Sequence, residues 1–381
     1  MGRTHVRVGI DNLSMAHDQL KDKRLGLMTH PCGYNSDLES SIDVLRARYR
    51  LTALFGCEHG IRGDVQDGLA VDRETDAATG IPIFSLYGKN YAPTPEMLGE
   101  IDAMVVDLQD VGARFYTFVY SMANVMIACA EAGKPVIVLD RMNPIDGVHV
   151  HGTLLDEKYH SFVGEYAIPT RHGLTIGEFA RFVKDHLKLD VRLTVVPMTG
   201  WRREMLWEDT DAVWTPPSPN MPTPRTALAY PGTCVFESTN VSEGRGTTTP
   251  FELIGAPFID GQALAERMCG MKLPGIGFLP ASFVPTFSKW EGERCHGVRV
   301  FVQNASADAF AAGLYLLETI LDMYPNDARF LVDDAGAEAT ASHLLGCVDF
   351  QRGLTDARGL IEKHRPLVEE FARFKTAYHI Y

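Results

Sequence analysis

The sequence predicts an α/β fold: a Rossmann-like, doubly wound and mostly parallel sheet, followed by a second, smaller α+β domain. A chain of 381 residues is long for one ordinary domain and suits two. Short apolar runs alternate with helical patterns through the first half, as they do in strand–helix–strand units. Five prolines then fall within residues 214–224, where the character of the sequence changes.

The predicted strands of the first half are continuous apolar runs of strand length. Such runs are typical of central parallel strands, because helices bury both faces of these strands. The runs lie at residues 24–29, 51–56, 103–108, 135–140 and 193–198.

Helices fit between these strands. Two residue pairs have the spacing of a capping box: Ser36 with Glu39, and Thr175 with Glu178. The first residue of each pair is therefore the predicted N-cap of a helix. Residues 116–133 are apolar on most sides and predict a buried helix.

The second half predicts a smaller α+β domain. Ser306 is the expected N-cap of one helix, and Pro366 is expected to separate the last two helices. Helices are expected at residues 261–270, 307–323, 355–364 and 366–377, and strands at 276–286 and 297–304. The predicted units are a catalytic domain at 1–215, a proline-rich connection at 216–225, and a second domain at 226–381 that completes a cleft.

The composition excludes several classes of protein. Lys and Arg number 36 against 49 Asp and Glu, so the net charge of −13 repels nucleic acid. No apolar run approaches the roughly 18 residues of a membrane-spanning helix, so we expect no membrane partner. The composition indicates a globular chain but no particular oligomeric state.

The seven cysteines are scattered and contain no C-x-x-C pair, which favours reduced thiols over a zinc ribbon or a disulfide framework. The N-terminal residues contain no long apolar segment of the kind found in signal peptides. We therefore expect a cytoplasmic protein from the sequence as written. A signal removed beforehand would instead imply a secreted or periplasmic protein.

Several common motifs are missing from the chain. G-x-G-x-x-G after a first strand and G-x-x-x-x-G-K-[ST] do not occur, so the sheet does not indicate NAD or ATP. H-E-x-x-H and G-x-S-x-G are also absent, which removes the commonest zinc-protease and serine-hydrolase interpretations. The sequence thus predicts no cofactor.

A dense group of charges, LFGCEHGIRGDVQDG at residues 54–68, begins as a strand ends. In a doubly wound sheet, functional groups gather at the carboxyl ends of the strands, which is where Glu58 and His59 would lie. A carboxyl group just past a buried strand is partly desolvated, which raises its pKa and suits a general acid near neutral pH. Taken alone, such a turn is more often a surface loop whose charges satisfy one another.

Other strand ends repeat this pattern, which favours one shared site. Asp107 and Asp140 also have a structural interpretation, since either can cap a helix or pair with an arginine. The residues expected to bind substrate are His59, Arg62, Asp64, Gln109, Arg114, Tyr116, Asp140, Arg141, Asn143, Arg171, His172, Asn220, Asn240, Arg245 and Thr247.

Some of these residues come from the second half of the chain and from the proline-rich connection that precedes it. Residues 234–252 contain Glu237, Glu243 and a glycine-flanked Arg245 beside several hydroxyls, a set that suits an anion or a polyhydroxyl ligand. Asn220 lies in the stiff proline-rich loop, which we expect to face the site. Trp290 in a nearby loop is more often a packing residue than a platform for sugars.

Eight long stretches occur in a characteristic order: LFGCEHGIRGDVQDG, PIFSLYGKNYAPTPEML, DLQDVGARFYTF, VLDRMNPIDG, RHGLTIGE, PPSPNMPT, YPGTCVFESTNVSEGRGTTTPFELIGAP and FVPTFSK. Together they make the chain resemble the bacterial exo-β-N-acetylmuramidase family, formerly a domain of unknown function, over residues 24–330.

The resemblance implies a Rossmann-like domain and a smaller domain with the site in the cleft between them. It implies release of N-acetylmuramic acid from the non-reducing end of peptidoglycan fragments, so the partner is a small carbohydrate. The family's proposed catalytic glutamate, in its E-H-G motif, falls on Glu58. The chain departs from the family at Cys57, where a proline is frequent, and in lacking the signal that many secreted members carry. The second departure bears on the compartment more than on the chemistry.

Glycoside cleavage needs an acid for the leaving oxygen and usually a second carboxylate. We expect Glu58 to be the acid, with His59 or Arg62 setting its pKa, and Asp110 or Glu243 to be the second group. A separation of about 5–5.5 Å favours a nucleophile and about 6.5–9.5 Å an attacking water, while the substrate's own 2-acetamido group offers a third route.

The muramic lactyl carboxylate requires a local cation, for which the candidates are Arg114, Arg141, Arg171 and Arg245. Two other functions stay open from the sequence. One is a non-catalytic muropeptide-binding module. The other is a metal-dependent phosphoesterase, whose ligands would be His59, Asp64, Asp67, Asp107, Asp110 and His172.

Overall fold

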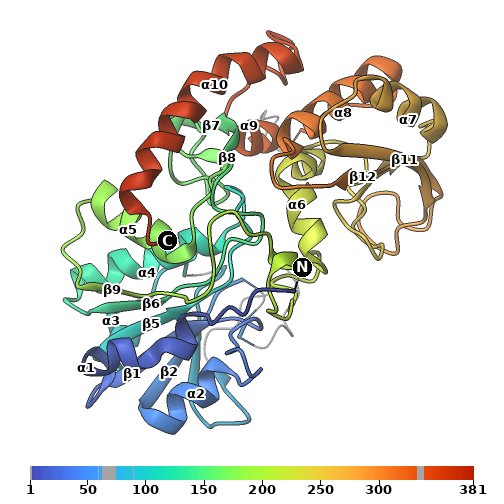
Figure 1. The fold of residues 1–381 in the computed structure, drawn as a ribbon. Coiled ribbons are helices and arrows are strands. Elements are labelled where there is room, and N and C mark those ends of the chain that lie inside the picture. Colours follow the sequence, from blue (N-terminus) through green and yellow to red (C-terminus); the bar gives the residue numbers. More distant parts are fainter. Residues whose placement is uncertain (1, 59, 62–73, 89, 333–338) are drawn as a thin grey trace.

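The computed structural model describes residues 2–381 with the exception of 59, 62–73, 89 and 333–338. A mostly parallel sheet of seven strands, in the order β3-β4-β2-β1-β5-β6-β9, forms the centre of the first half (Figure 1). Its strands are β1 (Arg24–Thr29), β2 (Arg50–Gly56), β3 (Glu74–Thr75), β4 (Pro82–Ser85), β5 (Ala103–Asp107), β6 (Val136–Leu139) and β9 (Leu193–Val196). Only the edge pair β3–β4 is antiparallel among the pairings of the described residues. The five predicted strands and the predicted fold class are confirmed.

Side chains alternate between the two faces along each central strand. On β5, Met104 and Val106 enter one hydrophobic core, whereas Ala103 and Val105 enter the other. The first face is covered by α3 (Pro95–Gly99), α4 (Phe118–Glu131) and α5 (Ile176–His186). The second is covered by η1 (Gly9–Ala16), α1 (His17–Leu20) and α2 (Ser41–Arg48) (Figure 1). Because both faces of these strands are buried, their sequences are continuous apolar runs.

One of the two predicted capping boxes is correct. At α5, the Thr175 hydroxyl accepts from Glu178 N, and the Glu178 carboxylate accepts from Thr175 N. The cap predicted at Ser36 is wrong, because the Ser36 hydroxyl donates to Asp11 Oδ2 at 2.6 Å. Ser40 caps α2 instead and accepts from Ile42 N.

The order of the strands reverses between β1 and β5. From β1 the chain moves outward through β2 and β4, and it then returns to place β5 on the opposite side of β1. The two strand ends are tied together there, since Gln109 N donates to His30 Nε2 at 2.8 Å. Ligands of open α/β sheets bind outside the carboxyl ends of the strands at such a reversal.

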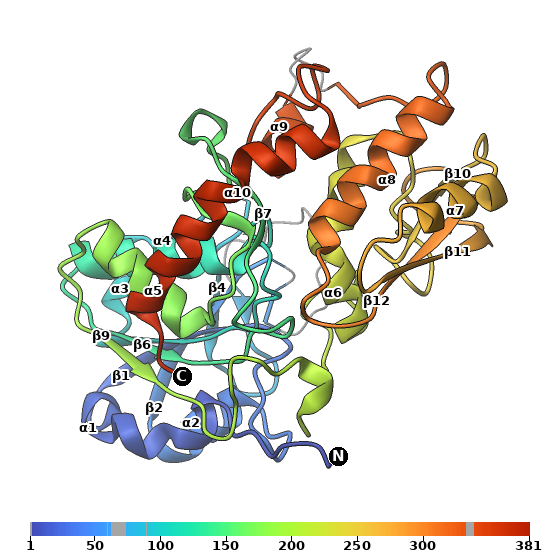
Figure 2. The same ribbon diagram turned by 45° about the horizontal axis from the view of Figure 1, so that its top comes forward.

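The second half begins with α6 (Pro224–Thr233) and η4 (Cys234–Ser238), and α6 lies between the main sheet and a second lobe (Figure 2). That lobe contains an antiparallel sheet in the order β10-β12-β11, packed against two helices. Its elements are β10 (Leu253–Ala256), α7 (Gly261–Gly270), β11 (Ile276–Phe283), β12 (Cys295–Val302) and α8 (Ala309–Met323). The cap expected at Ser306 is wrong, because Asp308 Oδ1 accepts from Ala311 N at 2.9 Å.

The chain ends by returning to the first half. After α9 (Ala339–Leu345), α10 (Ala357–Phe374) and η5 (Lys375–Tyr378) carry it back, and α10 contacts both α8 and β7 (Figure 2). The break expected at Pro366 is wrong: α10 continues through this residue. Pro366 is exposed, so the carbonyl that loses its helical partner can bind water. β7 (His151–Leu154) pairs antiparallel with β8 (Pro169–Arg171), and η2 (Glu157–Tyr159) and η3 (Trp207–Asp209) complete the fold.

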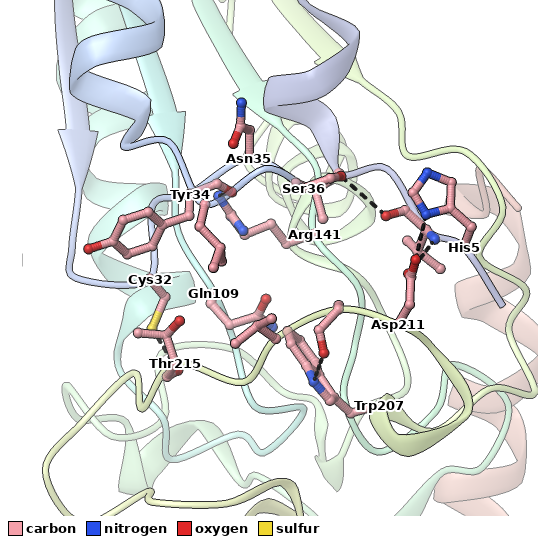
Figure 3. Close-up of a pocket in the computed structure, with 15 residues that line it drawn as sticks. His5, Cys32, Tyr34, Asn35, Ser36, Gln109, Arg141, Trp207, Asp211 and Thr215 are labelled. Atoms are coloured by element: carbon pink, nitrogen blue, oxygen red, sulfur yellow. Dashed lines mark hydrogen bonds and ion pairs between the residues drawn. The ribbon is translucent and has the colours of Figure 1, made fainter. Parts of the chain in front are cut away.

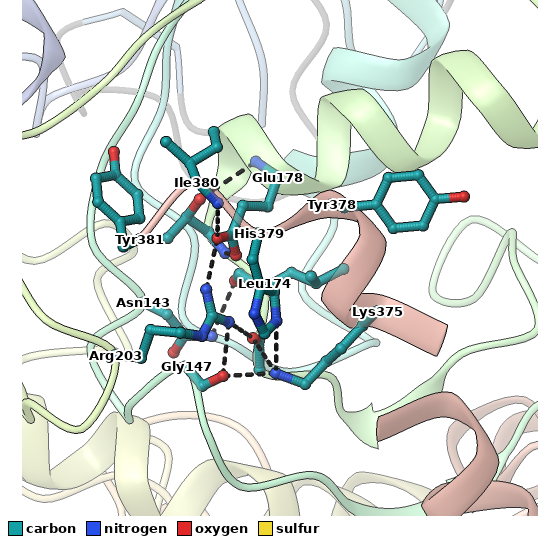
Figure 4. Close-up of polar contacts among 12 residues, drawn as sticks. Asn143, Gly147, Leu174, Glu178, Arg203, Lys375, Tyr378, His379, Ile380 and Tyr381 are labelled. Carbon is teal, nitrogen blue, oxygen red and sulfur yellow. Dashed lines mark hydrogen bonds and ion pairs between the residues drawn. The ribbon is translucent and has the colours of Figure 1, made fainter. Parts of the chain in front are cut away.

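The C-terminal tail is fixed to the first half by a buried polar network (Figure 4). Lys375 Nζ donates to Gly147 O at 2.6 Å and to Gly173 O at 3.0 Å. Arg203 donates to the same two carbonyls and pairs with Glu178. Because Gly173 directly follows His172, the tail supports the loop that carries this site candidate. None of the helices in the described ranges is both long and apolar enough to cross a membrane.

Candidate active site

Glu58 lies just beyond the end of β2, at the carboxyl edge of the sheet. Its side chain is half-buried, and Oε2 accepts a hydrogen bond of 2.9 Å from Thr117 Oγ1. Thr117 is the residue before α4, so the carboxyl group is held at the start of this helix. No hydrogen bond to Oε1 is present among the residues that the structure describes.

Cys57 is buried beside Glu58, with 2 % of its surface exposed. Burial raises the pKa of its thiol, and the neighbouring Glu58 raises it further. The thiol is therefore protonated at neutral pH and fills the wall behind Glu58, which does not suit a nucleophile.

Tyr116 connects Glu58 to the next strand end. Burial raises the pKa of its phenol well above 10, and the charges of Asp110 and Glu58 add to this effect. Its hydroxyl is enclosed and has no hydrogen-bond partner in the described part of the chain. The structure thus brings Glu58, Asp110 and Tyr116, three residues predicted for the site, into one neighbourhood.

Asp110 and His172 form the second polar pair of this neighbourhood. His172 Nδ1 accepts from Leu174 N at 3.2 Å, so a neutral ring carries its proton on Nε2. That nitrogen lies 3.4 Å from Asp110 Oδ2 but forms no hydrogen bond to a described residue, whereas Oδ2 accepts from Gly112 N at 2.7 Å. Within the described residues, Asp110 Oδ1 is buried without a partner. This carboxyl group is oriented by its surroundings and retains acceptor capacity.

Gly112 makes this turn possible. Its φ of +82° lies in the left-handed region, and a Cβ there would lie 2.5 Å from Asn143 Oδ1. Asn143 itself donates to Leu174 O and accepts from Ile145 N. Asn143, predicted to bind substrate, is thus occupied in packing the loops behind Asp110.

Gln109 and Arg141 line a small pocket of about 70 Å³ beside the ends of β5 and β6 (Figure 3). Arg141 is paired with Asp107 through bonds of 2.6 and 2.9 Å and also donates to Tyr34 O. A pocket of this size is smaller than the roughly 150 Å³ that holds a benzene molecule, so it does not accommodate a sugar ring.

Asp140, another residue predicted to bind substrate, is held by protein groups. Each Asp140 oxygen accepts two hydrogen bonds. Oδ1 accepts from Arg141 N and Gly177 N, and Oδ2 accepts from Thr175 Oγ1 and the Tyr381 hydroxyl. Burial raises the pKa of Asp140 to about 7. This residue joins the sheet, α5 and the C-terminus, so we leave it out of the proposed site.

Arg114 and Arg171 are buried structural cations. Arg114 has no exposed surface and donates to three backbone carbonyls, of Thr153, Ile168 and Leu344. Burial lowers its pKa to about 10. Arg171 pairs with Asp146 and donates to the carbonyls of Ile145 and Ala305. Neither guanidinium faces a free space where a substrate carboxylate would bind.

The second half supplies a cluster of four charges. Glu243 is 2 % exposed; Oε2 accepts from Lys289 Nζ at 2.8 Å, and Oε1 lies 3.4 Å from Arg245 Nε. Arg245 also donates twice to Glu237 Oε1, at 2.6 and 3.2 Å. The Glu243 carboxylate is thus committed to two cations, whereas Arg245 and Glu237 retain about a quarter of their side-chain surface exposed, 25 % and 28 %.

A row of aromatic rings connects this cluster to Tyr116. Tyr230 in α6 contacts Tyr116 with ring centroids 6.3 Å apart and Phe115 at 5.0 Å. On its other side it contacts Phe251 at 4.7 Å, and Arg245 lies over the Phe251 ring. The residues of the two halves therefore meet in one region.

The other predicted residues have separate locations. Asn240 is engaged with the backbone of Asp327 and Arg329, and it accepts from Trp290 Nε1 through its carbonyl. The Thr247 hydroxyl donates to Gly244 O, and Asn220 is partly exposed within the proline-rich run. His59, Arg62 and Asp64 lie outside the described residues, as does Asp67 of the metal-site alternative.

The sequence interpretation missed Thr117, Tyr230 and His30. His30 follows β1 directly but lies in no charged motif, Thr117 lies near the end of the charged motif after β5, and Tyr230 enters the region from a helix of the second half. In the described ranges, no three His, Cys, Asp or Glu side chains are grouped as metal ligands, and Asp107 is occupied by Arg141 and Ser41.

Comparisons with known proteins agree over the whole chain. The model of the N-terminal region of the exo-β-N-acetylmuramidase NamZ matches residues 25–225, and that of its C-terminal region matches residues 228–381. A relative from Bacillus subtilis, named peptidoglycan β-N-acetylmuramidase NamZ, is 46 % identical over 380 residues, which cover 99 % of this chain and 91 % of the relative.

Two solved structures from Bacteroides fragilis, both described as DUF1343 family proteins, have the same fold. One has a TM-score of 0.91 and 34 % identity and covers 100 % of both chains. The other has a TM-score of 0.78 and 30 % identity and covers 99 % of both. The chain belongs to the NamZ exo-β-N-acetylmuramidase family.

Proposed function

We propose that this protein is an exo-acting glycoside hydrolase that releases N-acetylmuramic acid from the non-reducing end of peptidoglycan fragments. Family membership and the name of the Bacillus subtilis relative support this activity. The observation that carries the proposal is the position of Glu58: it lies at the carboxyl edge of the sheet, next to the strand-order reversal, with Oε2 held by Thr117.

In the proposed mechanism, Glu58 protonates the glycosidic oxygen as the bond to the leaving sugar breaks. Asp110 is the second carboxyl group, because Gly112 N–H and His172 orient it and Oδ1 remains unpaired among the described residues. Glu243, the other candidate, is already neutralised by Lys289 and Arg245. The anomer formed first, followed by proton NMR, distinguishes inversion by an attacking water from the two retaining routes, in which a carboxylate or the substrate's 2-acetamido group attacks.

The lactyl carboxylate of muramic acid needs a cationic partner that substrate can reach. Arg114, Arg141 and Arg171 are each no more than 5 % exposed and hold protein oxygens. Arg245 is the most accessible of the four candidates, with 25 % of its side chain exposed. We therefore assign the lactyl group to the surface around Arg245.

The identity of the products tests the proposed function. The protein is incubated with a fragment that has muramic acid at its non-reducing end, and with one that has N-acetylglucosamine there. Mass spectrometry should detect free N-acetylmuramic acid from the first fragment and no cleavage of the second. Internal fragments from both would indicate an endo-acting enzyme and refute the proposal.

A further inference from the structure

Two glutamates of the second half, Glu237 and Glu243, differ in what their oxygens contact. Both Glu243 oxygens face cations, and the residue is 2 % exposed. Glu237 uses Oε1 alone to accept both hydrogen bonds from Arg245. Oε2 has no hydrogen bond to any described residue, and 28 % of the side chain is exposed. Glu237 thus presents one carboxylate oxygen that is fixed in place and accepts no hydrogen bond from the described part of the chain.

This oxygen is close to the region where the two halves meet. Glu237 lies in η4, directly after α6, and its charge acts on the Tyr230 phenol. Tyr230 in turn contacts Tyr116, whose phenol is influenced by Glu58 and Asp110. One aromatic side chain therefore separates the surroundings of Glu237 from those of Tyr116. Figure 1 shows α6 between the main sheet and the second lobe.

The rigidity of this carboxylate suits recognition of a hydroxyl group. The Arg245 guanidinium that holds Oε1 is itself braced by Glu243 and by the Phe251 ring. A carboxylate fixed in this way accepts a charge-assisted hydrogen bond without losing much side-chain freedom. It also leaves the local charge balanced, since Arg245 and Lys289 face Glu237 and Glu243.

The chemistry of the substrate limits which hydroxyl group can distinguish a terminal sugar from an internal one. In a terminal N-acetylmuramic acid, the 2-position carries the acetamido group, the 3-position the lactyl ether, and the 1-position the bond to be cleaved. Only the 4- and 6-hydroxyls are free. The 4-oxygen alone distinguishes a terminal from an internal sugar, because an internal sugar is linked through it. An exo-acting enzyme therefore benefits from a group that requires this hydroxyl, across the ring from the acid that acts at the 1-position.

We propose that Glu237 is the residue that determines exo-specificity, by accepting a hydrogen bond from the free 4-hydroxyl of the terminal sugar. The inference rests on the proposed function and on Glu58 as the acid from the first half. A glycosylated 4-oxygen has no proton to donate and brings a sugar against the carboxylate. A site built to bind a hydroxyl strongly rejects a ligand that lacks it.

The test compares 4-deoxy and 6-deoxy analogues of a chromogenic N-acetylmuramic acid glycoside. The wild-type protein should lose about 10- to 100-fold in kcat/KM when the 4-hydroxyl is removed, the range expected for a hydrogen bond to a charged group. In Glu237→Gln, Oε1 can still accept from Arg245 while an amide nitrogen replaces the free oxygen. There the 4-deoxy loss should fall to about threefold or less, while the 6-deoxy loss stays as in the wild type.

Each ratio is measured within one preparation, so a partly unfolded variant does not distort it. Glu237→Ala provides a second variant with the same expected ratio. An unchanged 4-deoxy loss in both variants overturns the assignment. If the wild-type protein does not hydrolyse the parent glycoside, the proposed function fails instead. Calorimetric binding of N-acetylmuramic acid and its 4-deoxy form then tests Glu237 separately: equal discrimination in wild type and variants would overturn its role.

Discussion

Replacement of Lys375 by methionine should change how the stability of the protein depends on pH. The Lys375 amine is 2 % exposed and donates to Gly147 O and Gly173 O. Its pKa is lowered from 10.5 to about 8, chiefly by burial and also by nearby Arg203, whereas Glu178 and Asp146 oppose this shift. Arg171 also faces the amine, and His379 contacts it at 3.4 Å.

The magnitude follows from the lowered pKa. Below about pH 8 the folded protein must hold a buried charge, which reduces the free energy of unfolding. As pH rises from about 8 to 10.5, the unfolded state binds more protons than the folded state, so stability increases. At about 1.4 kcal/mol per pH unit, this cost of charge burial amounts to at most about 3.5 kcal/mol for a pKa moved from 10.5 to about 8.

Urea unfolding of the wild type and Lys375→Met between pH 7 and 10.5 measures this difference. The variant lacks the titrating group but keeps both carbonyls paired, because Arg203 Nη2 donates to each at 2.7 Å. The wild type should gain stability relative to the variant across this range, by up to about 3.5 kcal/mol. Parallel profiles for the two proteins would refute the reasoning.

Three further outcomes concern the proposed chemistry. Asp110→Asn should lower kcat by about 10²–10⁴-fold with little change in melting temperature, and turnover near that of the wild type would remove Asp110 from the mechanism. Arg245→Gln should weaken muramyl substrates by more than about 1 kcal/mol in kcat/KM relative to glucosaminyl analogues, whereas an equal loss on both sugars would contradict the lactyl assignment. Exhaustive chelation should leave hydrolysis unchanged, since Asp107, a ligand of the phosphoesterase alternative, is occupied by Arg141 and Ser41; loss restored by a divalent ion would favour that alternative.

The central sheet was predictable because its strands are buried on both faces. Runs such as residues 103–108 have no polar alternation, and this pattern is local in the sequence. Caps were less predictable, since several polar residues compete at one helix start. Ser36 and Ser40 have similar sequence surroundings, and only the tertiary contact of Ser36 with Asp11 decides between them. Pro366 likewise stays within α10, at an exposed position where water can reach the carbonyl that loses its helical partner.

The gathering of candidate residues at one edge of the sheet was more predictable than the contacts that each side chain makes. The carboxyl ends of parallel strands meet at one edge of a sheet, which predicts that Glu58, Gln109 and Asp110 lie at the same edge. The structure places them there. The sequence cannot indicate which polar groups the fold itself consumes. Arg114 and Arg171 bind carbonyls of Leu344 and Ala305, which are more than a hundred residues away. Such contacts depend on the complete fold.

The turnover of Glu58→Gln on a chromogenic N-acetylmuramic acid glycoside tests the central claim most directly. Glu131→Gln, an exposed change at the end of α4, is the matched control. We expect Glu58→Gln to lose about 10²–10⁴-fold in kcat while binding N-acetylmuramic acid with nearly wild-type affinity, and Glu131→Gln to behave as the wild type. Hydrolysis by Glu58→Gln at the rate of the control would contradict the assignment of Glu58 as the catalytic acid.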